Sequence, residues 1–557
     1  MQAISTVWLG TLLVLLAGCS EPRSDALFED VTELSGMVVE RQSMVAPTLS
    51  LPAIMGTGVA LLDADNDGDL DVVLVKGGQD AGTSTAFSQL WLNESDGDLR
   101  FTPGPRLPRS SQAGRLAGIA VADANRDGRL DVLITTTETD QLLLNTNEGW
   151  RSADTAVSSL AQWSASAVWF DANRDGWPDL YVTGVAAFDA DVVCRSNTSL
   201  PDYCALTDYA PLSDRLFLNR GVDENGDGLT PRFEDVSRQW GLTRVQAPSV
   251  SMRILDVNGD DWPDVYVSHY GVDNALWVNR AGRGFENRAR EYGLASGFVA
   301  DQTRSVGVDA ADLDRDGDMD LVVALDQGQS HQLLINEGNV FLPMAFGAGG
   351  VSVAQSGGGL ALLDADADGW LDVYVANGAW RQQQRQLDAS DTLPLRQSNG
   401  LFMGRGEAQG FRKAPEQIEP LTPRSDVSRG VAAGDLDNDG DLDLVITSDS
   451  GVQVLRNRTN PGQWVGVRLV SNSSSVISGA RVRLLEPSAS LAREYRPGHS
   501  YLSSGDSRLV FYRESAPAPA DPVALVVEVV WPEGDREEFR LVSQPRYHTL
   551  IRGEGSP

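Results

Sequence analysis

Acidic side chains recur at a fixed spacing in seven nonapeptides, which we call the Asp loops. The loops span residues 63–71, 123–131, 171–179, 256–264, 312–320, 364–372 and 435–443. Each has Asp at positions 1, 5 and 9, and Asp or Asn at position 3. Oxygen atoms at alternate positions let one tight turn aim several side chains at a common centre, and the carbonyl group at position 7 adds another oxygen. Because Ca²⁺ takes six to eight oxygen ligands, the pattern predicts up to seven calcium ions.

The predicted metal ligands occupy positions 1, 3, 5, 7 and 9 of each loop, and position 7 acts through its backbone carbonyl. From the first loop to the seventh they are Asp63, Asp65, Asp67, Asp69 and Asp71; Asp123, Asn125, Asp127, Arg129 and Asp131; Asp171, Asn173, Asp175, Trp177 and Asp179; Asp256, Asn258, Asp260, Trp262 and Asp264; Asp312, Asp314, Asp316, Asp318 and Asp320; Asp364, Asp366, Asp368, Trp370 and Asp372; and Asp435, Asp437, Asp439, Asp441 and Asp443. The three tryptophan rings are expected to pack over their turns.

The EF-hand loop begins in the same way, but it needs a Glu at position 12 and a helix on each side. Position 12 is instead an aliphatic strand residue in every loop: Leu74, Ile134, Val182, Val267, Val323, Val375 and Ile446. A single match would be equally well explained as an Asp- and Gly-rich surface turn, whereas seven matches in register favour metal sites. The fourth loop has Gly259 one place early and Asp261 in the usual glycine position, so its ability to bind metal stays open.

Around each Asp loop the sequence indicates four short strands. An apolar segment enters the loop, a β-branched run leaves it, a third strand often ends in Asn, and a fourth contains an aromatic residue. Seven such units predict an all-β fold, a seven-bladed β-propeller over residues 28–457 with a small β-rich domain over residues 458–557. The seventh unit lacks its fourth strand, and residues 27–32 (LFEDVT) resemble residues 232–237 (RFEDVS). We therefore expect the N-terminal strand to close the last blade.

All Asp loops join the first and second strands of a unit, so they should share one face of the propeller. The two largest insertions, residues 185–214 and 378–399, join the second and third strands and should lie on the opposite face. We expect partner binding there, because functional residues concentrate on such loops.

The formal net charge of −33 argues against nucleic acid and anionic membrane surfaces as partners. Part of this charge belongs to the predicted calcium ligands. The last hundred residues are nearly neutral and are therefore expected to form a different module. Truncation at Asn457 should leave a propeller that folds alone.

An apolar run near the start ends in Leu16, Ala17, Gly18 and Cys19, which matches a bacterial lipobox. It predicts a lipoprotein signal peptide over residues 1–18, a lipidated Cys19 and a tether over residues 19–27. The segment before the run carries no Lys or Arg, which departs from an ordinary signal peptide. The protein should be exported to the bacterial cell envelope and held, through this lipid only, at the outer membrane.

Two further cysteines, Cys194 and Cys204, lie within a polar segment. In an exported protein they predict a local disulfide, and two unpaired surface thiols are the alternative.

On these residues the chain resembles the FG-GAP/VCBS repeats of integrin α-subunit propellers over residues 28–457. Residues 458–557 resemble the ASPIC/UnbV module of bacterial relatives of cartilage acidic protein. Asn457, Gly479, Ala480, Trp531, Pro532 and Gly534 carry this second match. Residues 509–514 (LVFYRE) depart from the His-Phe-Gly-Leu-Gly-like stretch of that family. The resemblance implies a calcium-binding extracytoplasmic protein and no assigned reaction.

No catalytic pattern is evident among the four His residues, and there is no nucleophile elbow, P-loop or dinucleotide fingerprint. A weaker pattern is a group in or beside the turns between second and third strands: His269, Tyr270, His331, Trp380 and Arg381. This group could contact a glycan or peptide, or consist of ordinary surface residues. Residues 223–228 (DENGDG), with Asp223, Asn225 and Asp227, could hold an eighth ion or form a plain hairpin turn.

The first hypothesis is therefore a non-catalytic, calcium-binding lipoprotein that presents a binding or adhesion face to a protein or glycan. The alternative is an enzyme or accessory subunit of an envelope or biosynthetic pathway that uses the propeller funnel. A third hypothesis gives the C-terminal module an assembly role in the envelope.

Overall fold

The computed structural model describes most of the chain. The described residues are 26–39, 49–77, 86–111, 114–159, 161–195, 199, 201–223, 226–296, 303–326, 330–338, 340–347, 355–381, 395–406, 410–415, 425–459, 461–471, 477–485, 490–495, 498, 500–512, 524–542 and 544–556. The predicted signal peptide (residues 1–18), Cys19 and most of the tether lie outside this range. Among the described residues, no helix has the length and apolar character needed to span a membrane.

The described part of the chain contains seven four-stranded antiparallel sheets that include the Asp loops, and this confirms the predicted all-β fold of repeated four-strand units. In chain order they consist of β2 (Val59–Leu62), β3 (Asp71–Lys76), β4 (Phe87–Asn93) and β5 (Phe101–Arg106); β6 (Leu116–Ala122), β7 (Asp131–Thr136), β8 (Gln141–Thr146) and β9 (Gly149–Ala153); β10 (Ser164–Phe170), β11 (Asp179–Gly184), β16 (Arg215–Val222) and β17 (Pro231–Asp235); β18 (Ser249–Leu255), β19 (Asp264–His269), β20 (Ala275–Asn279) and β21 (Phe285–Asn287); β22 (Ser305–Ala311), β23 (Asp320–Leu325), β24 (Gln332–Asn336) and β25 (Phe341–Ala345); β26 (Gly357–Leu363), β27 (Asp372–Asn377), β29 (Gly400–Gly404) and β30 (Phe411–Lys413); and β32 (Ser428–Gly434), β33 (Asp443–Ser448), β34 (Gly451–Asn457) and β1 (Phe28–Asp30).

The sheets follow one another as the blades of a propeller. The first strands of successive blades, β2, β6, β10, β18, β22, β26 and β32, contact each other in order, and β32 returns to β2. The second strands are almost entirely buried on both faces, which explains their β-branched, continuously apolar sequences.

The N-terminal strand closes the ring, as the repeat pattern predicts. β1 pairs antiparallel with β34, and Phe28 lies opposite Asn457. The Phe28 side chain is buried against the sixth and seventh blades. The last blade thus takes its outer strand from the other end of the chain, so its edge is covered.

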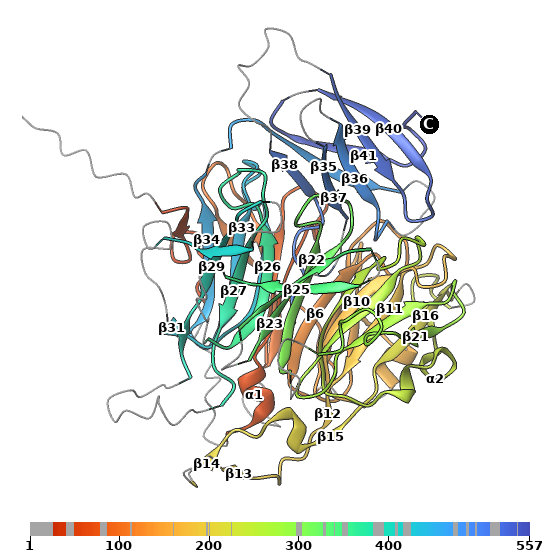
Figure 1. Cartoon of the computed structure of the whole chain (residues 1–557), viewed down its shortest axis with the longest axis vertical. Coiled ribbons are helices and arrows are strands. Elements are labelled where there is room, and N and C mark those ends of the chain that lie inside the picture. The colour runs from red at the N-terminus through yellow and green to blue at the C-terminus, as the bar shows by residue number, and fades with distance from the viewer. Residues whose placement is uncertain are drawn as a thin grey trace, which may run out of the picture.

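Short elements occupy the connections. They are α1 (Leu51–Met55), η1 (Ala156–Ser159), α2 (Ser237–Trp240), η3 (Leu242–Arg244), and the pairs β12 (Ala186–Ala187) with β15 (Ala210–Pro211), β13 (Cys194–Arg195) with β14 (Pro201–Asp202), and β28 (Gln397–Ser398) with β31 (Ser425–Asp426), together with η2 (Leu206–Asp208). The insertion between β11 and β16 and helix α1 lie at the end of the molecule remote from the C-terminal module (Figure 1).

The C-terminal module has two sheets of its own. β38 (Leu509–Tyr512), β35 (Trp464–Val470) and β41 (Tyr547–Ile551) form one, in which β35 and β41 are parallel. β37 (Ser490–Glu494), β36 (Arg481–Leu485), β39 (Ala524–Val530) and β40 (Arg536–Val542) form the other. Their facing side chains bury one apolar core that includes Trp531.

A segment of the C-terminal module runs along the propeller axis, and we call residues 500–506 the axial segment. The N–H of Leu61 donates to the Ser504 carbonyl and the N–H of Ile119 donates to the Leu502 carbonyl, both at 2.9 Å. The N–H of Leu360 donates to Ser500 Oγ at 2.6 Å. The axial segment therefore contacts the innermost strands of several blades.

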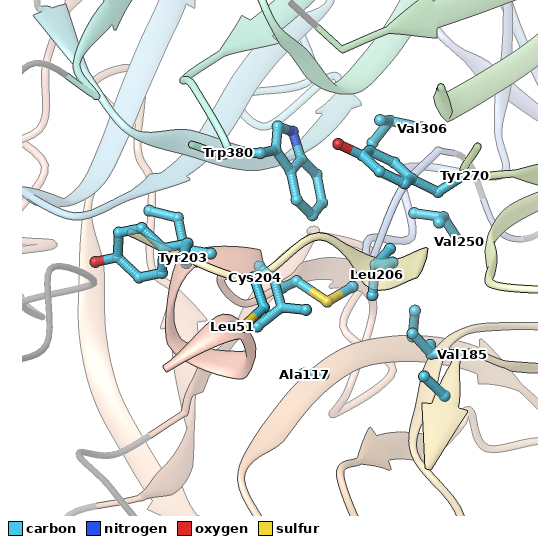
Figure 2. Close-up of a cluster of buried hydrophobic side chains, with 14 of the residues drawn as sticks. Leu51, Ala117, Val185, Tyr203, Cys204, Leu206, Val250, Tyr270, Val306 and Trp380 are labelled. Carbon is cyan, nitrogen blue, oxygen red and sulfur yellow. The ribbon is translucent and has the colours of Figure 1, made fainter. Parts of the chain in front are cut away.

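The axial segment also completes an apolar core at the end of the propeller remote from the rest of the C-terminal module. Tyr501 and Leu502 are buried in one cluster with Trp380, Tyr270 and Leu206, and the last three converge in Figure 2. A Cβ atom at position 58, where the chain has Gly, would lie 1.7 Å from the Leu502 carbonyl oxygen. The propeller core thus depends on residues beyond 457, and the expectation that a chain ending at Asn457 folds alone does not fit this packing.

We expect Leu502→Ala to lower the free energy of unfolding by about 2 to 5 kcal/mol, because it leaves a cavity among the innermost strands. Leu502 is 1% exposed, whereas Val542, in the module's own sheet, is 38% exposed. Val542→Ala is the matched control. Urea unfolding of both variants measures the difference, and equal effects would contradict an axial role for Leu502.

Candidate functional site

Each Asp loop is anchored by its position 9 carboxylate. In the first loop the N–H of Ala64 donates to Asp71 Oδ2 at 2.9 Å, and the N–H of Asn93 donates to Asp71 Oδ1 at 2.8 Å. The same pair of bonds, from position 2 and from the third strand of the same blade, recurs at Asp131, Asp179, Asp264, Asp320, Asp372 and Asp443. The carboxylate therefore joins the loop to its own blade.

These anchoring carboxyl groups have raised pKa values. Burial raises the pKa of Asp71 to about 7, against the opposing effect of its two N–H donors. Burial likewise raises the pKa of Asp131, Asp264 and Asp320 to about 8, with neighbouring aspartates adding to the shift. A cation in the loop would offset this electrostatic cost.

An Asn at the end of the third strand joins five of the seven blades to the preceding one. Asn145 Nδ2 donates to the Ala64 carbonyl oxygen of the first loop at 2.7 Å, and Asn93 Nδ2 donates to Leu436 of the seventh loop at 2.8 Å. Asn219, Asn279 and Asn457 make the equivalent bonds. The recurring Asn is visible in the sequence, but its partner is a carbonyl group in another repeat.

Side chains at position 4 reach position 7 of the next loop. The guanidinium groups of Arg126, Arg174 and Arg315 stack on Trp177, Trp262 and Trp370, at 4.3, 4.2 and 3.5 Å from the ring centroids. Asn438 Nδ2 donates to Asp69 Oδ1 at 2.7 Å across the junction of the last and first loops. The three indole rings thus pack between loops.

The fourth loop folds like the others despite its displaced glycine. Positions 4 and 6 have positive φ in every loop, and here they are Gly259 (φ 69°) and Asp261 (φ 64°). The N–H groups of Asp260 and Asp261 donate to the two oxygens of Asp256 at 3.1 and 2.9 Å. An Asp in the left-handed region is tolerated because Asp is among the residues that adopt it most readily.

The loops fall into two groups by their carboxylate clusters. In the first, fifth, sixth and seventh loops three carboxylates have oxygens within 4.8 Å of one another: Asp63, Asp65 and Asp67; Asp312, Asp314 and Asp316; Asp364, Asp366 and Asp372; and Asp435, Asp437 and Asp443. In the second, third and fourth loops the position 3 residue is Asn, and its amide donates to the position 5 carboxylate, as in Asn173 to Asp175 at 2.9 Å.

The clustered loops contain buried oxygens that receive no hydrogen bond from the described residues. They include Oδ1 of Asp63, of Asp312, of Asp364 and of Asp437. Burial raises the pKa of Asp364 to about 7 and that of Asp312 to about 6. Oxygens of this kind fit a hard cation, which would replace the missing donors.

A family model described as an FG-GAP-like repeat matches residues 63–134, 123–182, 256–323, 312–375 and 364–446. Each match runs from position 1 of one Asp loop to position 12 of the next, and together they cover more than half of the chain. The chain belongs to the FG-GAP-like repeat family. The interval between the second and third of these matches contains the insertion at residues 185–214.

The chain is also similar to curated relatives over most of its length. The chain is homologous to cartilage acidic protein 1 of Mus musculus, with 24% identity over 568 residues, covering 96% of this chain and 77% of the relative. The protein of the same name from Homo sapiens is 24% identical over 513 residues, covering 87% of this chain and 70% of the relative.

Two solved structures show weak overall similarity. One is an Agrocybe aegerita lectin that recognises non-reducing terminal N-acetylglucosamine (TM-score 0.40, 14% identity, 72% of this chain and 94% of that chain). The other is Saccharomyces cerevisiae Sqt1 (TM-score 0.37, 10% identity, 72% of this chain and 96% of that chain).

The predicted eighth site, residues 223–228, lies in the connection between β16 and β17. Asp227 accepts hydrogen bonds from the N–H groups of Leu229 and Thr230, and Arg151 lies 2.7 Å away. These bonds hold the pKa of Asp227 well below its usual range. Asn225 lies outside the described residues. The arrangement around Asp227 is that of a hairpin turn.

The group of His269, Tyr270, His331, Trp380 and Arg381 does not form an exposed binding surface. The first four side chains are at most 3% exposed. The Tyr270 hydroxyl donates to Asp326 at 2.6 Å, and Arg381 Nε lies 3.9 Å from Asp202. The expectation that these residues contact a partner is wrong for the four buried ones, because sequence position in a turn does not determine burial.

His331 is instead one of a set of side chains that accept a hydrogen bond from the last backbone N–H of the second strand in their blade. It accepts the N–H of Leu325 at 3.1 Å. Asp140, Asp214 and Asn274 accept the corresponding N–H groups of Thr136, Gly184 and His269 in other blades. Sequence reasoning missed this set because acid, amide and imidazole all serve as the acceptor.

The Cys194–Cys204 disulfide is present, with an S–S distance of 2.07 Å. This confirms the predicted bond and indicates an extracytoplasmic protein.

We expect Asp140→Asn to become more stable relative to the parent as the pH rises from 5 to 8. Burial raises the pKa of Asp140 from 3.8 to about 7. The folded state therefore binds the proton more tightly than the unfolded state, and this contribution to stability is lost as the pH rises through 7. Each unit of pKa difference corresponds to about 1.4 kcal/mol. Asn274 shows that an amide serves the same role in another blade.

Urea unfolding at several pH values measures the effect. Asn274→Asp is the reciprocal control and should lose stability over the same interval. A difference between Asp140→Asn and the parent that stays constant with pH would contradict the assignment.

Proposed function

We propose that this protein is a calcium-binding extracytoplasmic scaffold that binds a protein or glycan partner without catalysis. The observation that carries the proposal is a group of buried carboxylate oxygens, at Asp63, Asp312 and Asp364, that accept no hydrogen bond from the described part of the chain. The ligands would be the residues at positions 1, 3, 5 and 9 and the position 7 carbonyl, in up to seven loops.

The choice of calcium rests on the donor set. Every side chain offered is a carboxylate or an amide, and these oxygens suit a hard divalent cation better than a soft one. The loops are only partly exposed, so mutual repulsion of their carboxylates is weakly screened. Calcium supplies positive charge there and fixes the turn between the first and second strands.

The function of the ions would be structural. Each loop is tied to its own blade by the position 9 carboxylate and, in five of the seven, to the following blade around the ring through an Asn side chain of that blade. An ion that fixes one loop therefore also fixes the contact with its neighbour.

We place the proposed partner-binding face at the end opposite the C-terminal module, where β13 and β14 lie (Figure 1). The disulfide constrains this insertion, and Val193, next to Cys194, is 76% exposed. A rigid loop with an exposed apolar side chain binds with little loss of conformational entropy. A lipid on Cys19 would hold the scaffold at the outer membrane of the envelope.

The alternative, an enzyme that uses the propeller funnel, has less support. Tyr501 and Leu502 of the axial segment are buried inside the ring of innermost strands. The space that an axial substrate would need is therefore filled by the chain itself.

We expect Asp316→Ala to lose about one calcium ion per chain, because position 5 supplies a carboxylate ligand. Asp318→Ala, at position 7 of the same loop, should keep the ion because only the carbonyl group of that residue binds it. At calcium concentrations of 100 times Kd, the stabilisation lost by Asp316→Ala is about 2.7 kcal/mol. In chelator the two variants should melt alike.

Equilibrium dialysis with metal analysis, and melting with and without chelator, measure both variants. If Asp316→Ala and Asp318→Ala bind the same number of ions, the fifth loop does not hold calcium in the proposed way.

A further inference from the structure

The C-terminal module reaches the Asp loops with its own polar side chains. Arg468 Nη1 lies 3.4 Å from Asp63 Oδ2 in the first loop. Arg481 Nη2 lies 3.5 Å from Asp256 Oδ2 in the fourth loop, and the Tyr547 hydroxyl donates to Asp435 Oδ2 in the seventh at 2.8 Å. All three contacts are made to position 1 carboxylates.

The first loop differs from the others in how its position 1 carboxylate is held. In the second loop Asp123 accepts N–H groups from Asp127 and Gly128, and the third, fourth and seventh loops repeat both bonds. The fifth and sixth loops keep the bond from position 6. The Asp63 carboxylate instead accepts a hydrogen bond from Arg468, and none from a loop amide among the described residues.

The two oxygens of Asp63 therefore have different environments. Oδ2 faces Arg468, whereas Oδ1 is buried without a hydrogen bond from the described residues, and the Asp63 residue is 8% exposed. Carboxylate oxygens of Asp63, Asp65 and Asp67 lie within 4.8 Å of one another. One carboxylate can thus bind an ion on its inner side and the module on its outer side.

The strand that enters the first loop also pairs with the axial segment. Ala60 in β2 forms a parallel bridge with Ser504, and the N–H of Ser504 donates to the Val59 carbonyl at 2.9 Å. Residues 59–62 thus connect the axial segment to the first loop. Two residues, Leu61 and Leu62, separate Ala60 from Asp63.

We propose that calcium in the first Asp loop and docking of the C-terminal module on the propeller stabilise each other through Asp63. The proposal rests on the calcium binding of the proposed function. The ion would fix a carboxylate that no loop amide holds, so that Arg468 and the axial segment meet an ordered partner. In the absence of the ion, Arg468 alone would have to order Asp63.

The charges weaken the Arg468 contact but do not abolish it. The first loop carries five aspartates, a formal charge of −5, and one divalent ion leaves −3. Arg468 is still attracted to the loaded loop, although less than to the empty one, so the favourable coupling must come from the ordering of Asp63 by the ion. Since energetic coupling is reciprocal, loss of the Arg468 contact must lower calcium affinity by the factor by which calcium strengthens that contact.

The test uses Arg468→Gln in the full chain, with Arg483→Gln as the matched control. Arg483 is a similarly exposed arginine of the same module that pairs with Glu528 within the module. Calcium affinity is measured by titration calorimetry. Docking is measured by amide hydrogen exchange of residues 500–506 and of β35, with and without calcium.

We expect calcium to slow exchange of these amides in the parent and in Arg483→Gln. In Arg468→Gln the factor by which calcium slows amide exchange should decrease by about fivefold. One calcium site should lose affinity by the same factor. Arg468→Lys, which keeps the charge, should recover most of both effects.

Calcium binding with no change in exchange of residues 500–506 would overturn the coupling and leave the proposed function intact. So would equal behaviour of Arg468→Gln and Arg483→Gln. Absence of calcium binding in the parent would overturn the proposed function and the coupling together.

Discussion

The structure depends on a buried carboxylate that accepts two backbone N–H groups at the start of every second strand. Such a group is stable only if both donors are in place, because an unsatisfied buried charge is costly. The donors come from the loop and from the third strand of the same blade, and Asn side chains continue the connection to the preceding blade. Five of the seven loops are thereby joined to a neighbouring blade, and the acidic residues contribute to the architecture whether or not an ion is bound.

The C-terminal module is part of this architecture. Its axial segment fills the space between the innermost strands, and its arginine and tyrosine side chains meet loop carboxylates. A ring of blades leaves an axis that short side chains cannot fill, and here a distant part of the chain fills it. The end with the Asp loops thus faces the module, and the disulfide-stapled insertion remains at the other end (Figure 1).

Much of this could be read from the sequence. The period of the Asp loops gave the four-strand units, and the likeness of residues 27–32 to residues 232–237 gave the closing strand, because both signals are local repeats. The axial segment could not be read, because residues 500–506 (SYLSSGD) have the composition of a surface loop and pair with strands hundreds of residues away. The burial of His269, His331 and Trp380 could not be predicted either, because the residues that cover these side chains come from other blades and from the insertion at residues 185–214.

The central claim is that the Asp loops hold calcium and that the ions stabilise the propeller. The most direct test is the number of calcium ions bound per purified chain, measured together with thermal melting before and after chelation. The account predicts about six to seven ions and a large fall in melting temperature on chelation. No bound calcium, with unchanged melting, would contradict it and would mean that the loops are turns held by their own hydrogen bonds.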